Sequence, residues 1–270
     1  MMNKLRKIPT FLLHLSLLLA ACQPTLVAEF SDRPVVECYL YSDEPVRLKI
    51  STLIPYRDGV QFSGENIDQL AITVRDETLG SACLLAPQGD GVYASDSDFI
   101  PQPEHLYALH FSYDGEDVTA ETQLAALPQN VAFSSSSITV PSFGGGGFGG
   151  GGGMTGITIS WSNSERDYYV LTTRCFNPDS VLLIDSGVVR TTADALLQDS
   201  LTMLSPMQFS YFGRHEIRLC RVQPEYAALL TRSEQSRSSQ TLTEVNANVA
   251  GGFGIFTGVS CVRKEILVSK

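Results

Sequence analysis

The residue with the clearest chemical signature lies near the N-terminus, where the sequence Leu-Ala-Ala precedes Cys22. This pattern matches the bacterial lipobox, in which the cysteine is diacylated and then becomes the first residue of the mature chain. Positive residues begin the chain, and the apolar stretch over residues 8–21 is shorter than the ~20 apolar residues that span a bilayer. This pattern is typical of a signal peptide. We therefore predict a signal peptide over residues 1–21 and lipidation at Cys22.

Acylation would hold the mature chain at a membrane surface without a segment that spans the bilayer. Each buried CH₂ of an acyl chain contributes ~0.8 kcal/mol, so two or three chains anchor a protein firmly. Gln23, which follows Cys22, is not the aspartate that retains lipoproteins at the inner membrane. We therefore expect a lipid-anchored protein of the outer membrane that faces the periplasm or the cell surface.

The mature chain is strongly acidic. Residues 1–21 contain three of the 19 basic residues and no acidic ones, which leaves 16 basic against 29 acidic residues and a net charge of −13. Such a surface repels phosphate backbones and anionic lipid head groups. The composition therefore argues against nucleic acid as a partner, and we expect membrane contact only through the lipid anchor.

Five cysteines follow Cys22. The cell envelope is oxidising and permits disulfides, but an odd number leaves at least one cysteine outside an intramolecular pair. None belongs to a Cys-x-x-Cys pair, so zinc-ribbon and thioredoxin-like sites lack support. The pairing stays open, and an equally good interpretation is that several of them are small buried hydrophobic residues. The five are Cys38, Cys83, Cys175, Cys220 and Cys261.

Side chains that perform acid–base or metal chemistry are few. The histidines beyond the predicted signal peptide are His105, His110 and His215. His105 and His110 are five residues apart in a predicted strand, so they point to opposite faces and cannot share a metal ion. No nucleophile elbow, zinc-protease motif, complete EF-hand loop or phosphate-binding loop occurs. We therefore predict no catalytic or metal-binding residue and no cofactor.

The elements that must position these groups are mostly strands. Val46, Leu48 and Ile50 alternate with polar residues, which is the period of a half-buried strand. Residues 105–113 alternate in the same way, and an Asp-Gly pair at residues 114–115 then favours a turn. Recurrent turns without long helical patterns are typical of an antiparallel β-sandwich. One face of the strand predicted over residues 105–113 carries Tyr107, Leu109, Phe111 and Tyr113.

We predict a mainly β protein with two antiparallel β-sandwich-like halves and one short helix near the C-terminus. The helix begins at Pro224, which suits a first turn, and extends to about Arg237. A Gly-rich loop at residues 144–153 holds nine glycines in ten positions and is expected to be flexible. The predicted parts are a lipid tether at 22–32, an N-terminal half at 33–127 and a C-terminal half at 128–270.

A second glycine-rich segment, residues 251–258, precedes the last predicted strand at 259–268. It is not a nucleotide-binding fingerprint, because it leads into a strand rather than a helix. We interpret it as a place of close backbone packing, where glycines accept unusual φ and ψ and three apolar residues fill the core. The alternative is a recognition loop. The three apolar residues are Phe253, Ile255 and Phe256.

Three groups of residues in the mature chain carry a likeness to a known family. They are residues 34–40 with 44–46 and 53–55, residues 120–122 (Ala-Glu-Thr), and residues 246–249 (Asn-Ala-Asn-Val) followed by 251–258. The chain thereby resembles, from about residue 33 to 268, the outer-membrane lipoproteins known as domain of unknown function 4249, found mainly in Bacteroidota. The closing segment is the most specific part of the likeness, and the Gly-rich loop is not a family feature.

The resemblance implies a role rather than a reaction. The family has no established activity, and its genes often lie beside those of TonB-dependent outer-membrane receptors, which is an association and not a site. We therefore expect a non-enzymatic accessory or binding component associated with a TonB-dependent transporter. The alternatives are an envelope hydrolase without a recognisable motif and a structural or adhesive surface protein.

Overall fold

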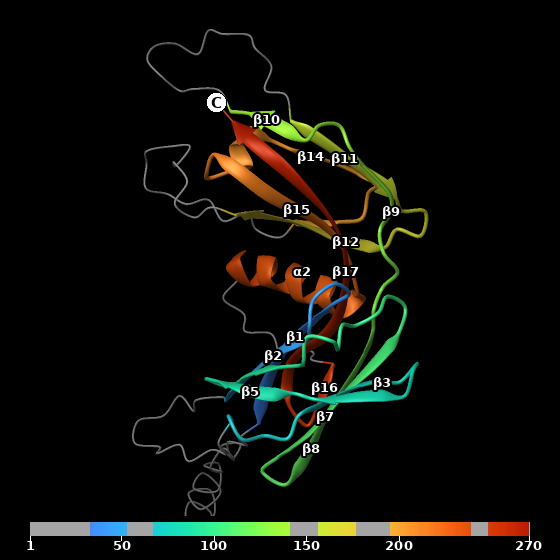
Figure 1. The fold of residues 1–270 in the computed structure, drawn as a ribbon, viewed down its shortest axis with the longest axis vertical. Helices are drawn as coiled ribbons and strands as arrows, with labels where there is room; N and C mark the ends of the chain where they lie inside the picture. Colours follow the sequence, from blue (N-terminus) through green and yellow to red (C-terminus); the bar gives the residue numbers. More distant parts are fainter. Residues whose placement is uncertain (1–32, 53–66, 141–155, 177–194, 239–247, 270) are drawn as a thin grey trace, which may run out of the picture. The chain divides into compact units, whose positions relative to one another are not determined.

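The computed structural model describes residues 33–52, 67–140, 156–176, 195–238 and 248–269. These residues form mainly β-strands in three sheets, with one α-helix in the described part near the C-terminus (Figure 1). The mainly β prediction is therefore confirmed. Several predicted features lie outside the described residues, namely the signal peptide at 1–21, Cys22, the tether at 22–32 and the Gly-rich loop at 144–153.

The largest sheet contains strands from both predicted halves of the chain. Its strands follow the order β13-β12-β15-β17-β1-β2-β6-β5, and β10 pairs with β17 beside this path. The first and last described strands are therefore neighbours, which the sequence did not predict. The strands are β1 (Pro34–Tyr41), β2 (Arg47–Thr52), β5 (Ala86–Gly89), β6 (Val92–Ala94), β10 (Ser137–Thr139), β12 (Tyr168–Cys175), β13 (Ala195–Leu197), β15 (Gly213–Val222) and β17 (Phe253–Ser269).

Two smaller sheets complete the described fold. One has the order β16-β8-β7-β3-β4, and the other has the order β14-β11-β9. A short 3-10 helix, η2 (Pro206–Gln208), follows β14. The strands are β3 (Thr73–Asp76), β4 (Ser81–Leu84), β7 (Leu106–Tyr113), β8 (Glu116–Gln123), β9 (Gln129–Phe133), β11 (Ile157–Ser162), β14 (Leu201–Leu204) and β16 (Val249–Ala250).

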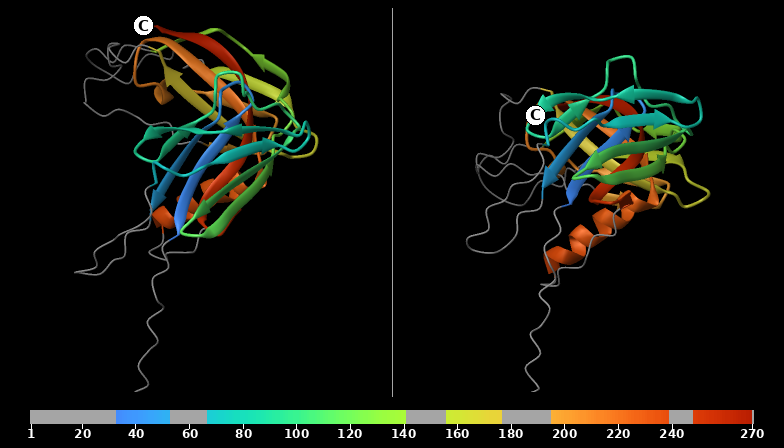
Figure 2. Two further views of the ribbon diagram at one scale, coloured as in Figure 1. Left: turned by 60° about the horizontal axis from the view of Figure 1, so that its bottom comes forward. Right: turned by 90° about the horizontal axis from the view of Figure 1, so that it is seen from below.

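Each smaller sheet packs on a different part of the large sheet, so the described chain has two sandwich-like cores. The first core joins Val36 of β1 and Leu48 of β2 to Phe111 of β7. Figure 2 shows the strands of the five-stranded sheet crossing over β1 and β2. The second core joins Ile159 of β11 to Ile217 of β15. The two cores agree with the predicted sandwich-like fold class, although the first core also contains Val249 and Phe256 from the predicted C-terminal half.

The β7–β8 hairpin confirms the alternation expected from the sequence. The four apolar residues of β7 on its inner face are at most 2% exposed, because they point into the first core. Asp114 and Gly115 have φ values of 50° and 80°, which is the left-handed pair that a two-residue hairpin turn requires. The inward residues are Tyr107, Leu109, Phe111 and Tyr113.

The last strand, β17, begins at Phe253 rather than at the predicted residue 259. Its first part pairs in parallel with β1, and its later part pairs antiparallel with β15. Gly254 permits the first pairing, since it has a φ of 101° and a Cβ there would lie 1.9 Å from the carbonyl oxygen of Val36. The segment predicted to precede the strand is therefore already part of it.

The predicted core role of residues 251–258 is confirmed for two of three apolar residues. Phe256 is fully buried and Ile255 is 7% exposed. Phe253 is 37% exposed, so its predicted place in the core is wrong. It lies at the first position of β17, opposite Val35 of β1.

The predicted helix is confirmed as α2 (Pro224–Ser238). Tyr226 and Leu230 pack over the large sheet, on the face opposite the second core. Cys220 and Cys261 form a disulfide in this helix-covered layer, between directly opposed positions of β15 and β17. Cys38 is a buried thiol instead, and burial raises the pKa of its side chain.

Candidate functional site

The three histidines considered in the sequence analysis, His105, His110 and His215, lie in three separate places and do not form a common site. His105 Nδ1 lies 2.8 Å from Asp76 Oδ2 in a hydrogen bond. His110 lies on the exposed face of β7, where its Nε2 is 3.4 Å from Asp117 Oδ1. His215 is buried in β15, and a backbone carbonyl oxygen lies 3.1 Å from its Nδ1. Burial lowers the pKa of His215, which favours the neutral ring.

Asp76 is the centre of a buried hydrogen-bonded cluster at the end of β3. Its Oδ2 accepts the Tyr107 hydroxyl at 3.0 Å in addition to its bond with His105. Its Oδ1 accepts the backbone N–H groups of Thr78 and Leu79 at 2.9 and 3.0 Å. Burial alone would raise the pKa of Asp76, but these hydrogen bonds outweigh it and lower the pKa. Mainly through burial, the pKa of Tyr107 rises to about 12.

We expect the substitution Asp76→Asn to lower the free energy of unfolding by about 2 kcal/mol, because an amide cannot accept hydrogen bonds at both positions. Since the folded-state pKa is lowered, the carboxylate stabilises the fold above its unfolded pKa. That stability is lost as the pH falls through the folded-state pKa. Denaturant unfolding at about pH 7 and about pH 3 should therefore show a steeper loss for the wild type than for the variant.

A second Asp–His pair provides the matched control for this prediction. The side chains of Asp117 and His110 are 77% and 60% exposed. Exposed ion pairs contribute only ~0.2–1 kcal/mol, so Asp117→Asn should change stability little at either pH. Equal losses in the two variants would contradict the structural role assigned to Asp76.

A network of charged side chains joins the turn after β1 to strands β15 and β17. Arg218 lies 2.9 Å from Glu44 and 2.5 Å from Glu216. Arg263 lies 2.5 Å from Asp43 and 2.7 Å from Glu44. Glu216 is 8% exposed and also lies 3.6 Å from Arg263. Because the two guanidinium groups offset all but one of the three carboxylate charges, we assign the network a structural role at the junction of the two sandwich-like parts.

Parts of the three groups of residues on which the predicted resemblance rests meet near the start of α2. The hydroxyls of Thr122 and Thr257 donate to the Glu225 carboxylate at 2.9 and 3.0 Å. The Asn248 side chain donates to the Phe256 carbonyl at 2.6 Å and accepts the Phe256 N–H at 3.0 Å. Strand β1, from the opening segment, pairs with β17 beside them. These residues therefore hold the fold together.

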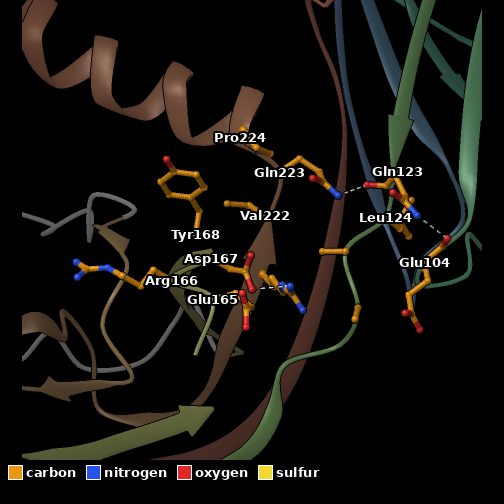
Figure 3. Close-up of a pocket in the computed structure, with 13 residues that line it drawn as sticks. Glu104, Gln123, Leu124, Glu165, Arg166, Asp167, Tyr168, Val222, Gln223 and Pro224 are labelled. Carbon is orange, nitrogen blue, oxygen red and sulfur yellow. Dashed lines mark hydrogen bonds and ion pairs between the residues drawn. The ribbon is translucent and has the colours of Figure 1, made fainter. Parts of the chain in front are cut away.

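An open groove of about 550 Å³ lies beside the start of α2 (Figure 3). One wall consists of Glu104 and residues 123–126, and the other consists of residues 165–168, which lead into β12. The end of β15 and the start of α2, residues 221–224, complete the lining. The lining is polar, with carboxylate, guanidinium, amide and phenol groups.

Hydrogen bonds hold the walls of the groove in place. Gln123 Nε2 donates to the carbonyl oxygen of Glu104 at 3.0 Å, and Gln223 Nε2 donates to the carbonyl oxygen of Gln123. On the other side, Arg221 forms an ion pair with Asp167 at 2.5 Å. Figure 3 shows the contacts of Gln123 with Glu104 and with Gln223 as dashed lines. The groove is therefore preformed and does not require a ligand to order it.

Two residues of the groove have backbone conformations that non-glycine residues rarely adopt. Glu104 has a φ of 65° and Arg166 has a φ of 57°. Such conformations are uncommon and cluster at functional sites. The Asn163 side chain holds the loop between β11 and β12, which contains Arg166. It accepts the Asp167 N–H at 2.8 Å and donates to the Asp167 carbonyl at 3.0 Å. Asp90, Asp114 and Asn130 also have positive φ, so we select the groove as the candidate site because two such residues coincide there with a polar lining.

The groove provides groups for non-covalent binding of a polar ligand. Asp167 and Arg221 neutralise each other, whereas the carboxylates of Glu104 and Glu165 belong to opposite walls. In the parts of the chain that the structure describes, no group of three or more potential metal-binding side chains occurs. The chemistry that the described groove residues offer is recognition by charge and hydrogen bonds.

Sequence analysis predicted none of the groove residues. They come from chain segments near residues 104, 124, 166 and 223, which are brought together only by the fold. The one local signal is the alternation of charge at residues 165–167, and this pattern is typical of any solvent-exposed turn.

No protein-family model matches this chain, and no curated protein matches it significantly. Within the described residues, no helix is both long and apolar enough to cross a membrane. The resemblance to domain of unknown function 4249 and the lipidation of Cys22 therefore stay predictions.

Proposed function

We propose that this chain is a lipid-anchored envelope protein that binds a partner non-covalently, as an accessory component of a TonB-dependent outer-membrane transporter. The observation that carries the proposal is the preformed polar groove beside the start of α2. Its walls are held by hydrogen bonds and by the Arg221–Asp167 ion pair. A preorganised surface of this kind loses little conformational freedom on binding, which favours recognition.

Three further observations support an envelope location. The lipobox at Cys22 follows a positive and apolar leader. The Cys220–Cys261 disulfide suits an oxidising compartment. The resemblance of residues 33–268 associates the chain with outer-membrane receptors. A lipid tether would also raise the effective concentration of the groove near a membrane partner.

We expect site-specific photo-crosslinking in intact cells to trap a β-barrel receptor from the groove. A photoreactive phenylalanine analogue in place of Tyr168 keeps an aromatic ring in the groove wall. The same analogue in place of His110, on the exposed face of β7, is the matched control. Mass spectrometry of the adducts should identify a TonB-dependent receptor from position 168 only. Equal adducts at both positions, or no barrel protein at either, would refute the proposal.

An envelope hydrolase is the second candidate function, because Asp76 orients His105 much as a carboxylate orients the histidine base of hydrolases. The two candidates differ in what His105→Gln does to transport. A hydrolase would lose its cellular function while its crosslinks at position 168 persist. An accessory protein would keep transport unchanged in this variant and in His110→Gln.

A further inference from the structure

We propose that a second copy of this chain pairs with the outer edge of β4, and that Cys83 joins the two copies through a disulfide. Strand β4 ends the five-stranded sheet, and no strand of the described residues pairs with its outer edge. Proteins commonly protect such edges with charged side chains, proline or a bulge. β4 has none of these, since it runs Ser-Ala-Cys-Leu in continuous register with β3.

The backbone of β4 offers matching hydrogen-bonding groups to a second copy of itself. The Leu85 N–H donates to the carbonyl oxygen of Ile72, and hydrogen-bonded pairs alternate along an antiparallel ladder. The N–H and C=O groups of Ala82 and Leu84 therefore point away from β3, toward the open edge. When two copies of β4 pair antiparallel about Cys83, Ala82 of each copy lies opposite Leu84 of the other. Each outward donor then meets an outward acceptor.

The side chains at this edge suit a contact between two copies of an acidic chain. Leu79, in the turn before β4, and Leu84 are 68% and 67% exposed, the highest values among the large apolar residues of the described chain. Residues 78–89 contain no charged side chain. Because like charges repel elsewhere on the surface, an uncharged apolar segment is where two acidic copies can approach each other.

Cys83 lies on the two-fold axis of this pairing. Its own N–H and C=O groups point to β3, so the two Cys83 residues face each other as a non-hydrogen-bonded pair, with Cα atoms ~4.5 Å apart. This spacing lies within the ~4.4–6.8 Å that disulfides span. The Cys83 thiol is reduced in the single chain and donates to the carbonyl oxygen of Leu84 at 3.7 Å. Since that oxygen points to the open edge, the thiol lies on the side that a second copy would approach.

The intermolecular bond forms by thiol–disulfide exchange with a disulfide oxidant, RS–SR. The Cys83 thiolate attacks one sulfur of the oxidant, and RS⁻ leaves and takes up the proton that Cys83 lost. The thiolate of the partner's Cys83 then attacks the mixed disulfide and releases the second RSH. Both cysteines are oxidised and the oxidant is reduced to two thiols. The Cys220–Cys261 bond suits a compartment that supplies such oxidants.

The test uses the full chain in membranes of the cells that express it, with thiols blocked by N-ethylmaleimide before non-reducing electrophoresis. We expect a band at twice the monomer mass that a dithiol removes, and a Cys83–Cys83 peptide pair in mass spectrometry. Cys83→Ser should lose this band, whereas Cys175→Ser, which alters a half-exposed thiol at the end of β12, should keep it. A wild type that stays monomeric, or a dimer that survives Cys83→Ser, would overturn the proposal.

Ala82→Pro tests the strand pairing while the thiol stays in place. The Ala82 N–H points outward, so proline removes a donor of the interface and none from the β3–β4 ladder. The disulfide dimer should fall about tenfold, because the two-fold axis removes the same hydrogen bond twice. Leu201→Pro is the matched control, since Leu201 is 60% exposed on the edge strand β14. An unchanged dimer in Ala82→Pro, or its loss in Leu201→Pro, would refute pairing through β4.

Moving the thiol by one residue tests the register. Cys83→Ser/Leu84→Cys places the thiol at a far more exposed position, but one that faces Ala82 of the partner subunit. We therefore expect this double variant to form much less disulfide dimer than the wild type. Random collisions would favour the more exposed thiol, so an equal or stronger dimer band from the double variant would show that β4 does not set the contact.

Discussion

Replacing Cys220 and Cys261 together with alanine is expected to lower the free energy of unfolding by about 4 kcal/mol. The disulfide closes a loop with a sequence separation of 41 residues, and restricting such a loop in the unfolded chain gives a stabilisation of about this size. The bond also lies in the layer that α2 covers, where Cys220 is 3% and Cys261 is 7% exposed. Denaturant unfolding of the oxidised wild type and of the double variant measures the difference.

Two controls separate the crosslink from the loss of two buried side chains. Reducing the wild type with a dithiol breaks the bond without removing an atom of the core, so it should reproduce most of the loss. Cys83→Ala removes a buried sulfur that lies outside the disulfide, and truncating a single buried side chain this small should lower stability much less. Identical midpoints for the oxidised and the reduced wild type would contradict the assigned pairing.

Replacing Cys22 with serine is expected to move the protein from the membrane fraction to the soluble fraction. Serine carries no thiol, so the acyl chains cannot be attached, and each acyl CH₂ that no longer inserts removes ~0.8 kcal/mol of membrane affinity. Metabolic labelling with palmitate should mark the wild type and not the variant. Because this anchor is the only predicted attachment to the bilayer, the redistribution should be nearly complete.

Cys175→Ser is the matched control for the anchoring experiment. Cys175 ends β12, far along the chain from the predicted lipobox, so this variant should keep both the label and the membrane location. A wild type that takes up no palmitate, with a Cys22→Ser variant that still sediments with membranes, would reject the lipoprotein prediction.

Elements that depend on neighbouring residues could be predicted from the sequence. The alternation of Tyr107, Leu109 and Phe111 placed a buried face on β7, because successive side chains of a strand point to opposite sides. The Asp-Gly pair at 114–115 predicted its turn, and Pro224 predicted the first turn of α2. In each case the determining physics acts within a few residues, so a short stretch of sequence contains it.

Features that depend on distant residues were decided only by the tertiary structure. The five cysteines left several pairings open, and the register of β15 against β17 selects Cys220 and Cys261. The start of β17 was misplaced because its parallel partner, β1, lies more than two hundred residues earlier in the chain.

The groove shows the same limit for the candidate site. Gln223 reaches Gln123 across a sequence separation of 100 residues. The carbonyl oxygens of Glu104 and Arg166, which both have positive φ, accept hydrogen bonds from Gln123 and Gln198, 19 and 32 residues away. Exposed polar residues of this kind have no periodic pattern, because burial does not constrain them. The sequence by itself therefore determined local features such as the buried face of β7, its turn and the start of α2, whereas the pairing of remote strands decided the disulfide, the shared sheet and the groove.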